Sequence, residues 1–231
     1  MNISLRVTIY ISFCLSLVLL LSACSKPGEN EGLIRYDVKF NDEEKEVFPI
    51  IEILPNTMNY YFKNGSTVSE ISFLGLFRTA YISNLESEEN SVLFYYMPKG
   101  YYVSTKFGEK TIGFDPMPGI ILTETDEVKN ILGFSAHKVN VSFEHDTIEP
   151  YDIWYTKEFN IENPNWHTPY KDIDGVLLDY RIKMKGISMH LTISSFSDNQ
   201  VDSSRFVIPQ TYTRVTPEEM DDIFDRYLQM F

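Results

Sequence analysis

Cysteine is scarce in this chain: its 231 residues include only two, Cys14 and Cys24. A framework of several disulfides, the usual support of small secreted domains, is therefore excluded. Basic residues are also few, because 20 Lys and Arg face 33 Asp and Glu and give a formal net charge of −13. Phosphate backbones are bound by clustered positive charge, and no basic patch stands out, so we expect no nucleic-acid partner.

The spacings typical of metal sites are also lacking. None of the histidines forms a pair at the i, i+4 spacing of a helical zinc site, and no cysteine is free to join them. We therefore expect no metal and no cofactor, and histidines that are exposed or half-buried with structural roles. The four histidines are His137, His145, His167 and His190.

Signals for a catalytic nucleophile are weak. Ser135 and His137 are two positions apart on a predicted strand and point to the same face, but no Gly-x-Ser-x-Gly elbow surrounds Ser135. A hydrolase would need at least two of Ser135, His137, His167, Asp172 and Asp174 to converge in a cleft. We expect no catalytic residue and a protein that is not an enzyme.

The first 24 residues carry the signal of a secreted lipoprotein. Arg6 precedes an uncharged apolar stretch, Val7 to Leu21, which is short for a membrane-spanning helix. The stretch ends in Leu-Ser-Ala-Cys at residues 21–24, which matches the bacterial lipobox, whose cysteine thiol accepts a diacylglycerol. We predict a signal peptide over residues 1–23, cleavage between Ala23 and Cys24, and lipidation of Cys24. An uncleaved anchor helix is the alternative.

Lipidation assigns the rest of the chain to the cell envelope. Residues 24–32 contain proline and glycine but no core residues, and are predicted to form a lipidated tether. Residues 33–231 are predicted to form a single β-rich domain without a disulfide. We expect the lipid anchor at Cys24 to insert into the outer membrane. We expect the domain to lie on the periplasmic face of this membrane rather than at the cell surface.

Apolar residues recur at every second position from residue 33 to about residue 196, which is typical of half-buried strands. No long helix interrupts them, so the pattern predicts a large antiparallel sheet or barrel. Residues 160–175 are rich in loop formers and are expected to cross the edge or mouth of the sheet. Hairpins are predicted around residues 64–65, 97–100 and 185–186, and further strands at 34–40, 47–54, 78–83, 110–114, 120–123, 134–143 and 151–155.

One helix is predicted at the C-terminal end. Thr216 is a suitable N-cap, Pro217 suits the first helical position, and Glu219 completes a capping box. The apolar residues that follow fall on one stripe, so the helix is expected to lie across the apolar face of the sheet. They are Met220, Ile223, Phe224, Tyr227, Leu228 and Phe231.

Aromatic residues are abundant, at 14% of the chain. Several are adjacent, as in Tyr60-Tyr61-Phe62 and Tyr95-Tyr96, and adjacent residues of a strand point to opposite faces. Two interpretations stay open. The sheet is covered and fully packed on both sides, or its concave side encloses an apolar cavity for a lipid-like ligand.

Three stretches resemble a known group of proteins. Residues 129–139, 152–158 and 174–180 are similar to those of the GLPGLI-type and related uncharacterised lipoproteins of Bacteroidetes. These look like members of a wider group with the LolA/LolB-like fold. The chain departs from them at Ser135-Ala136, where relatives often carry a cysteine.

The resemblance implies a curved, half-open antiparallel barrel, mainly β within the α+β class, with the C-terminal helix packed on its concave face. Carriers with this fold bind acyl chains under the helix, and no catalytic residue comes with the resemblance. The expected function is a non-enzymatic envelope lipoprotein that binds an apolar or lipid-like ligand. An interaction or structural module with a packed core is the first alternative, and a hydrolase is the second.

Overall fold

The computed structural model describes residues 30–109, 112–144 and 148–229. The predicted signal peptide, its cleavage site between Ala23 and Cys24, and most of the tether lie outside these residues, as do His145 and Phe231. The described residues form one sheet of 12 strands, in the spatial order β12-β6-β5-β4-β3-β2-β1-β11-β10-β9-β8-β7.

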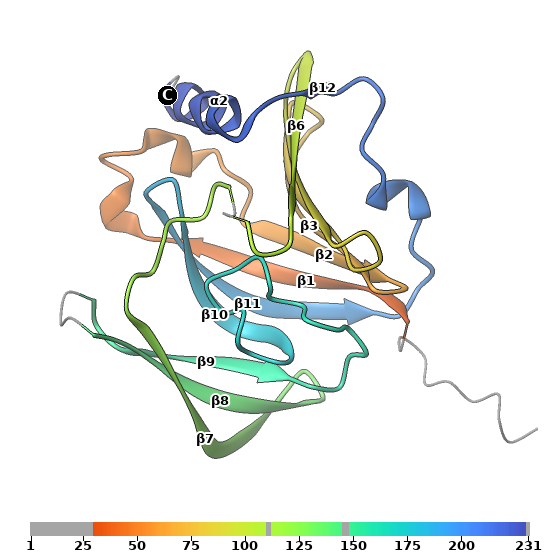
Figure 1. Ribbon diagram of the computed structural model, residues 1–231. Coiled ribbons are helices and arrows are strands. Elements are labelled where there is room, and N and C mark those ends of the chain that lie inside the picture. The colour runs from red at the N-terminus through yellow and green to blue at the C-terminus, as the bar shows by residue number, and fades with distance from the viewer. Residues whose placement is uncertain (1–29, 110–111, 145–147, 230–231) are drawn as a thin grey trace, which may run out of the picture.

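The sheet is curved and open (Figure 1). Every pair of neighbouring strands is antiparallel except β12 and β6, which run parallel. The predicted fold class, a mainly antiparallel and half-open β structure, is confirmed. The strands are β1 (Glu31–Phe40), β2 (Thr57–Lys63), β3 (Ser66–Phe73), β4 (Phe77–Asn84), β5 (Glu89–Tyr96), β6 (Lys99–Lys106), β7 (Ile120–Ile131), β8 (Phe134–Phe143), β9 (Tyr151–Thr156), β10 (Val176–Met184), β11 (Ile187–Ser197) and β12 (Thr213–Arg214).

Strand β1 joins the two halves of the sheet, because it pairs with β2 on one side and with β11 on the other. Its buried residues Ile34, Tyr36 and Val38 alternate with exposed Arg35 and Asp37, as the sequence pattern predicts. The hydroxyl of Tyr36 donates a hydrogen bond to the carbonyl of Leu177 at 2.7 Å. The inner face of β1 is therefore the centre of the core.

Hydrophobic side chains form two clusters, one on each face of the sheet. The large inner cluster includes Tyr60, Phe62 and helix α2, whereas the small outer cluster includes Tyr61. Adjacent aromatic residues thus point to opposite faces, and residues 198–215 cover the outer one through Val201 and Tyr212. Both clusters lie between residues 33 and 228, so a chain of residues 25–231 contains the whole core. We call this chain the anchor-free form.

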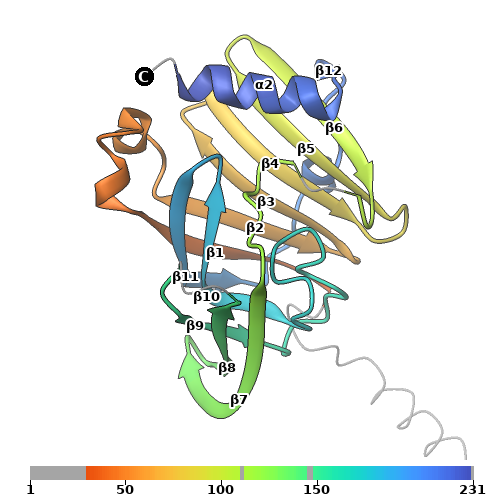
Figure 2. The ribbon, with the colours of Figure 1, turned by 60° about the vertical axis from the view of Figure 1, so that its left-hand side comes forward.

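Helix α2 (Pro217–Leu228) begins with the predicted capping box. The Glu219 backbone N–H donates to Thr216 Oγ1 at 3.2 Å, and the Thr216 N–H donates to the Glu219 carboxylate at 2.8 Å. The helix lies across one end of the sheet (Figure 2), with Met220, Phe224 and Tyr227 buried. Its predicted position on the apolar face is confirmed. In the described part of the chain, no helix has the length and apolar character needed to cross a membrane.

Two predicted strands are wrong. Residues 47–54 contain a 3-10 helix, Pro49–Glu52, because proline cannot donate to a strand ladder and because the neighbours Ile50 and Ile51 are both buried. In the predicted strand at 110–114, the described part is irregular. Gly113 has a φ of +88°, and Phe114 forms only an isolated bridge to Met184.

Strand β7 is longer than the sequence pattern predicts. Residues 124–131 are mostly polar and exposed, because β7 is an edge strand and both of its faces meet water here. An alternation of apolar and polar residues does not arise in such a strand.

Candidate functional site

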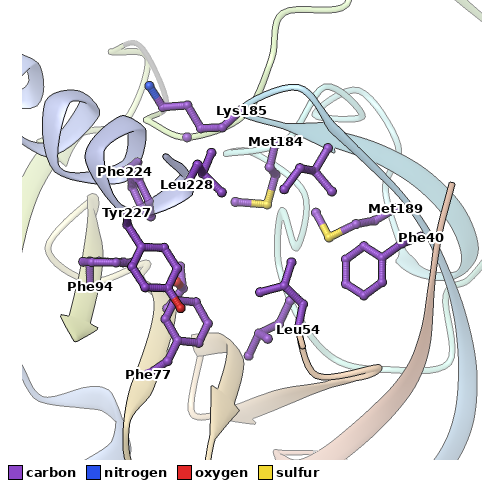
Figure 3. A pocket seen from close by; sticks show the side chains of 14 residues that line it. Phe40, Leu54, Phe77, Phe94, Met184, Lys185, Met189, Phe224, Tyr227 and Leu228 are labelled. Atoms are coloured by element: carbon purple, nitrogen blue, oxygen red, sulfur yellow. The ribbon is translucent and has the colours of Figure 1, made fainter. Parts of the chain in front are cut away.

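An apolar cavity of about 90 Å³ lies beneath helix α2 (Figure 3). We call it the α2 cavity. Helix α2 covers it with Phe224, Tyr227 and Leu228, which fall on one helical stripe at i, i+3 and i+4. The other lining residues are Phe40, Leu54, Ile71, Phe77, Thr79, Phe94, Gly113, Met184, Lys185, Ile187 and Met189.

Aromatic side chains fix the helix over this cavity. The ring of Tyr227 stacks on Phe77, with centroids 5.1 Å apart and planes 8° apart. Phe224 meets Phe94 edge to face at 5.0 Å. Both contacts join α2 to β4 and β5, so this side of the cover is firmly packed.

A second cavity, of about 50 Å³, lies deeper inside the curved sheet, and we call it the inner cavity. It shares Ile71, Thr79, Met184 and Met189 with the α2 cavity, so the two lie side by side. Methionine has three rotatable bonds and fills irregular gaps, so the partition between the cavities can change shape. The inner cavity is also lined by Met58, Ser69, Glu70, Tyr81, Phe114, His167, Thr168, Tyr180, Ile182 and Leu191.

A larger and more polar space of about 420 Å³ adjoins both cavities, and we call it the polar vestibule. It shares Gly113 and Lys185 with the α2 cavity, and Phe114, His167 and Thr168 with the inner cavity. The three spaces therefore adjoin one another, with the shared side chains between them. The remaining residues of the vestibule are Asp115, Pro116, Met117, Ile120, Pro169 and Asp221.

Lys185 ties α2 to the turn between β10 and β11. Its ammonium nitrogen lies 3.0 Å from Asp221 Oδ1 and 3.0 Å from Asp225 Oδ1, two carboxylates one helical turn apart. Burial alone lowers the pKa of Lys185, but the hydrogen bonds to Asp225 and Asp221 outweigh it and raise this pKa above its usual value. The turn itself is fixed by the N–H of Gly186, which donates to Asp115 Oδ2 at 2.9 Å. We call this ion-pair group the Lys185 latch.

His167 departs from the expectation of an exposed or half-buried histidine. Its side chain is buried, with 4% of the residue exposed, and its ring stacks on Tyr81 with centroids 6.2 Å apart. Burial lowers the pKa of His167 to about 4, so the imidazole is neutral at neutral pH. Its Nδ1 atom is buried and has no hydrogen-bond partner.

Among the described residues, no hydrogen bond or ion pair joins any two of the candidates Ser135, His137, His167, Asp172 and Asp174. Ser135, Asp172 and Asp174 are exposed, and His137 is half-buried against Tyr155 with ring centroids 5.6 Å apart. His167, by contrast, is buried inside the curved sheet. Among the described residues, no group of three His, Cys, Asp or Glu side chains is arranged to hold a metal ion.

The places of Lys185 and His167 in this site were not predicted from the sequence. Lys185 was predicted only as part of a turn, and the carboxylates that pair with it lie more than 30 positions further along the chain. His167 stands in a segment predicted to be a loop, and its burial depends on how that loop folds back. Comparisons of the chain with protein-family models and with curated proteins give no match, so the resemblance to LolA/LolB-like lipoproteins stays a prediction.

Proposed function

We propose that the chain is a non-enzymatic, membrane-anchored envelope lipoprotein that binds an apolar or lipid-like ligand beneath helix α2. The observation that carries the proposal is the α2 cavity, whose wall is almost entirely hydrocarbon and aromatic. An apolar wall that faces an empty space has no packed side chains against it. Such a wall gains dispersion contacts when a ligand enters.

The size of the cavities sets a condition on the ligand. An engineered apolar cavity of about 150 Å³ binds benzene, whereas drug-sized ligands occupy pockets of roughly 300–1,000 Å³. The α2 cavity, at about 90 Å³, and the inner cavity, at about 50 Å³, accept a short apolar group as they stand. A longer chain requires α2 to move outward and the methionines to change rotamer.

Helix α2 is suited to such a movement. It follows the last strand along the chain and covers the α2 cavity with Phe224, Tyr227 and Leu228. Its aromatic contacts join it to β4 and β5, and the Lys185 latch joins it to the β10–β11 turn. Helix α2 would therefore open first when a ligand enters.

The anchor would hold the domain close to a membrane. If Cys24 carries lipid, residues 24–30 precede β1 and span at most about 25 Å when extended. The tether would keep the start of β1 within this distance of a bilayer, so the domain would stay beside the membrane and could exchange lipid-like molecules with it.

Titration of the anchor-free form with N-phenylnaphthylamine, an uncharged dye that fluoresces in apolar surroundings, tests ligand binding. We expect saturable fluorescence at about one dye per chain, and competition by decane-length alkyl compounds. If the fluorescence is no greater than that of the dye with an unrelated protein at the same concentration, the proposal is contradicted.

One observation favours the first alternative, an interaction module. The tips of the β3–β4 and β5–β6 hairpins lie together, because the Met97 N–H donates to the Leu76 carbonyl at 3.0 Å, and they expose apolar side chains. Leu74 is 82% exposed and Met97 is 55% exposed. If this surface binds a protein, the variants Leu74→Asp and Met97→Asp lose a cross-linked partner in cells and keep the dye binding. Unchanged cross-linking in both variants argues against the alternative.

A further inference from the structure

The loop that carries His167 is held in one conformation. It connects β9 to β10, and the Asn165 side-chain amide donates to the carbonyls of Ile173 at 2.9 Å and Gly175 at 2.7 Å. The indole N–H of Trp166 donates to Ser83 Oγ on β4 at 2.5 Å. These bonds insert His167 between the loop and the inner face of the sheet. Its burial is therefore a fixed property of the fold.

The unpaired Nδ1 of His167 is costly. A buried polar atom without a partner typically costs about 1–3 kcal/mol, and such atoms are rare in folded proteins. The aromatic rings of Tyr81, Phe114 and Trp166 surround the imidazole and do not satisfy Nδ1. A phenylalanine would stack in the same place without this cost, so packing alone does not explain a histidine here.

His167 lines both the polar vestibule and the inner cavity. A molecule with its apolar part in the two cavities and its polar end in the vestibule would bring that end next to the imidazole. A neutral imidazole carries one N–H and one free nitrogen lone pair, so either tautomer can form a hydrogen bond with a hydroxyl group, which both donates and accepts.

The charges around the vestibule disfavour an anionic ligand. Its charged lining residues are Asp115, Asp221 and Lys185, and Lys185 is already neutralised by Asp221 and Asp225. Asp115 adds a further negative charge. A carboxylate or phosphate head group would therefore meet a net negative surface, whereas an uncharged head group would not.

We propose that the site binds an amphiphile with an uncharged hydroxyl head group, which forms a hydrogen bond with the imidazole of His167 while its alkyl chain lies under α2. This inference rests on the proposed function and deepens it, because it names the ligand class of the same site. His167 would be the residue that selects alcohols over fatty acids.

Competition against N-phenylnaphthylamine tests the inference in the anchor-free form and in a His167→Phe variant. The competitors are decanol, decanoate and decane, which share one chain length. In the unsubstituted form we expect decanol to compete at least tenfold more strongly than decanoate. In His167→Phe we expect decanol to weaken by about tenfold, the equivalent of about 1.4 kcal/mol. The circular dichroism spectrum of His167→Phe should match that of the unsubstituted form, which shows that the variant is folded, and decanol competition is compared with decane competition within each form.

Each outcome separates the inference from the proposed function. If the dye and decane bind but decanol competes equally in both forms, the role of His167 is wrong and the apolar site stands. If decanoate competes as well as decanol, the uncharged head group is wrong. If neither the dye nor any competitor binds the unsubstituted form, the proposed function fails, and the inference fails with it.

Discussion

The ammonium group of Lys185 lies 3.0 Å from a carboxylate oxygen of Asp221, and this pair joins the β10–β11 turn to helix α2 beside the α2 cavity. The side chains are partly buried, with 20% of Lys185 and 32% of Asp221 exposed. The latch and the aromatic contacts thus hold the cover of the cavity from opposite sides.

The Lys185 latch should contribute measurably but modestly to stability. In a double-mutant cycle with Lys185→Met and Asp221→Asn, urea unfolding should give a coupling free energy of about 0.5–1 kcal/mol, because partly exposed ion pairs fall in this range. The matched control is the pair Lys157 and Asp174, which is more exposed and 3.9 Å apart, and which should show no coupling. Equal coupling for both pairs would mean that the latch has no special role.

Filling the space under α2 should weaken ligand binding without unfolding the protein. Met184 lines both cavities, so Met184→Phe places a ring into existing space and should weaken N-phenylnaphthylamine binding at least tenfold. The thermal midpoint should change little. Met97→Phe, at an exposed position, is the control and should bind dye normally. Full binding by Met184→Phe would place the dye elsewhere.

The buried imidazole of His167 should make stability depend on pH. As the pH falls below 6.5, the unfolded chain binds a proton at this histidine, whereas the folded chain, with a pKa of about 4, does not. The free energy of unfolding should therefore fall by about 2 kcal/mol between pH 7 and pH 5 from this group alone. His167→Phe should remove this part of the loss, as measured by urea unfolding at both pH values.

The same substitution should raise the stability of the ligand-free protein at pH 7, because it removes an unpaired polar atom. His137→Phe is the control, since His137 is only half-buried and has no buried unpaired nitrogen, and it should not raise the stability at pH 7. Identical pH dependence in the His167→Phe and unsubstituted proteins would show that this imidazole does not titrate differently on folding.

The anchor prediction concerns Cys24. Cells fed an alkyne-tagged fatty acid should label the full chain, and Cys24→Ser should abolish the label, since the thiol is the predicted acceptor. Cys14→Ser should keep it, because Cys14 belongs to the predicted signal peptide. Persistent labelling of Cys24→Ser would overturn the lipobox assignment.

The elements that could be predicted from the sequence are those whose pattern depends only on residues close together in the chain. The alternation in β1 is visible because one of its faces is buried and the other is wet. The capping box of α2 is visible because Thr216 and Glu219 bond to each other's backbone. Such local patterns need no knowledge of the rest of the fold.

The candidate site depends on contacts between distant segments, so the sequence predicted it only in outline. The stripe of α2 and the aromatic surplus suggested a cavity or a packed core, and the choice between them depends on how well Phe224 and Met184 fill the space. The partners of Lys185 and the burial of His167 follow from the curvature of the sheet and the course of the β9–β10 loop. Neither is encoded in a pattern of neighbouring residues.

Native mass spectrometry tests the central claim most directly. The samples are the anchor-free form and its Met184→Phe variant, each purified from bacterial cells. The spectra are recorded as purified and after incubation with decanol. The account predicts a non-covalent adduct on the unsubstituted chain, either of lipid-like mass as purified or after incubation with decanol. It predicts the bare chain mass for Met184→Phe under both conditions. Bare mass for the unsubstituted chain under both conditions, or equal adducts on both proteins, would contradict a ligand site beneath α2.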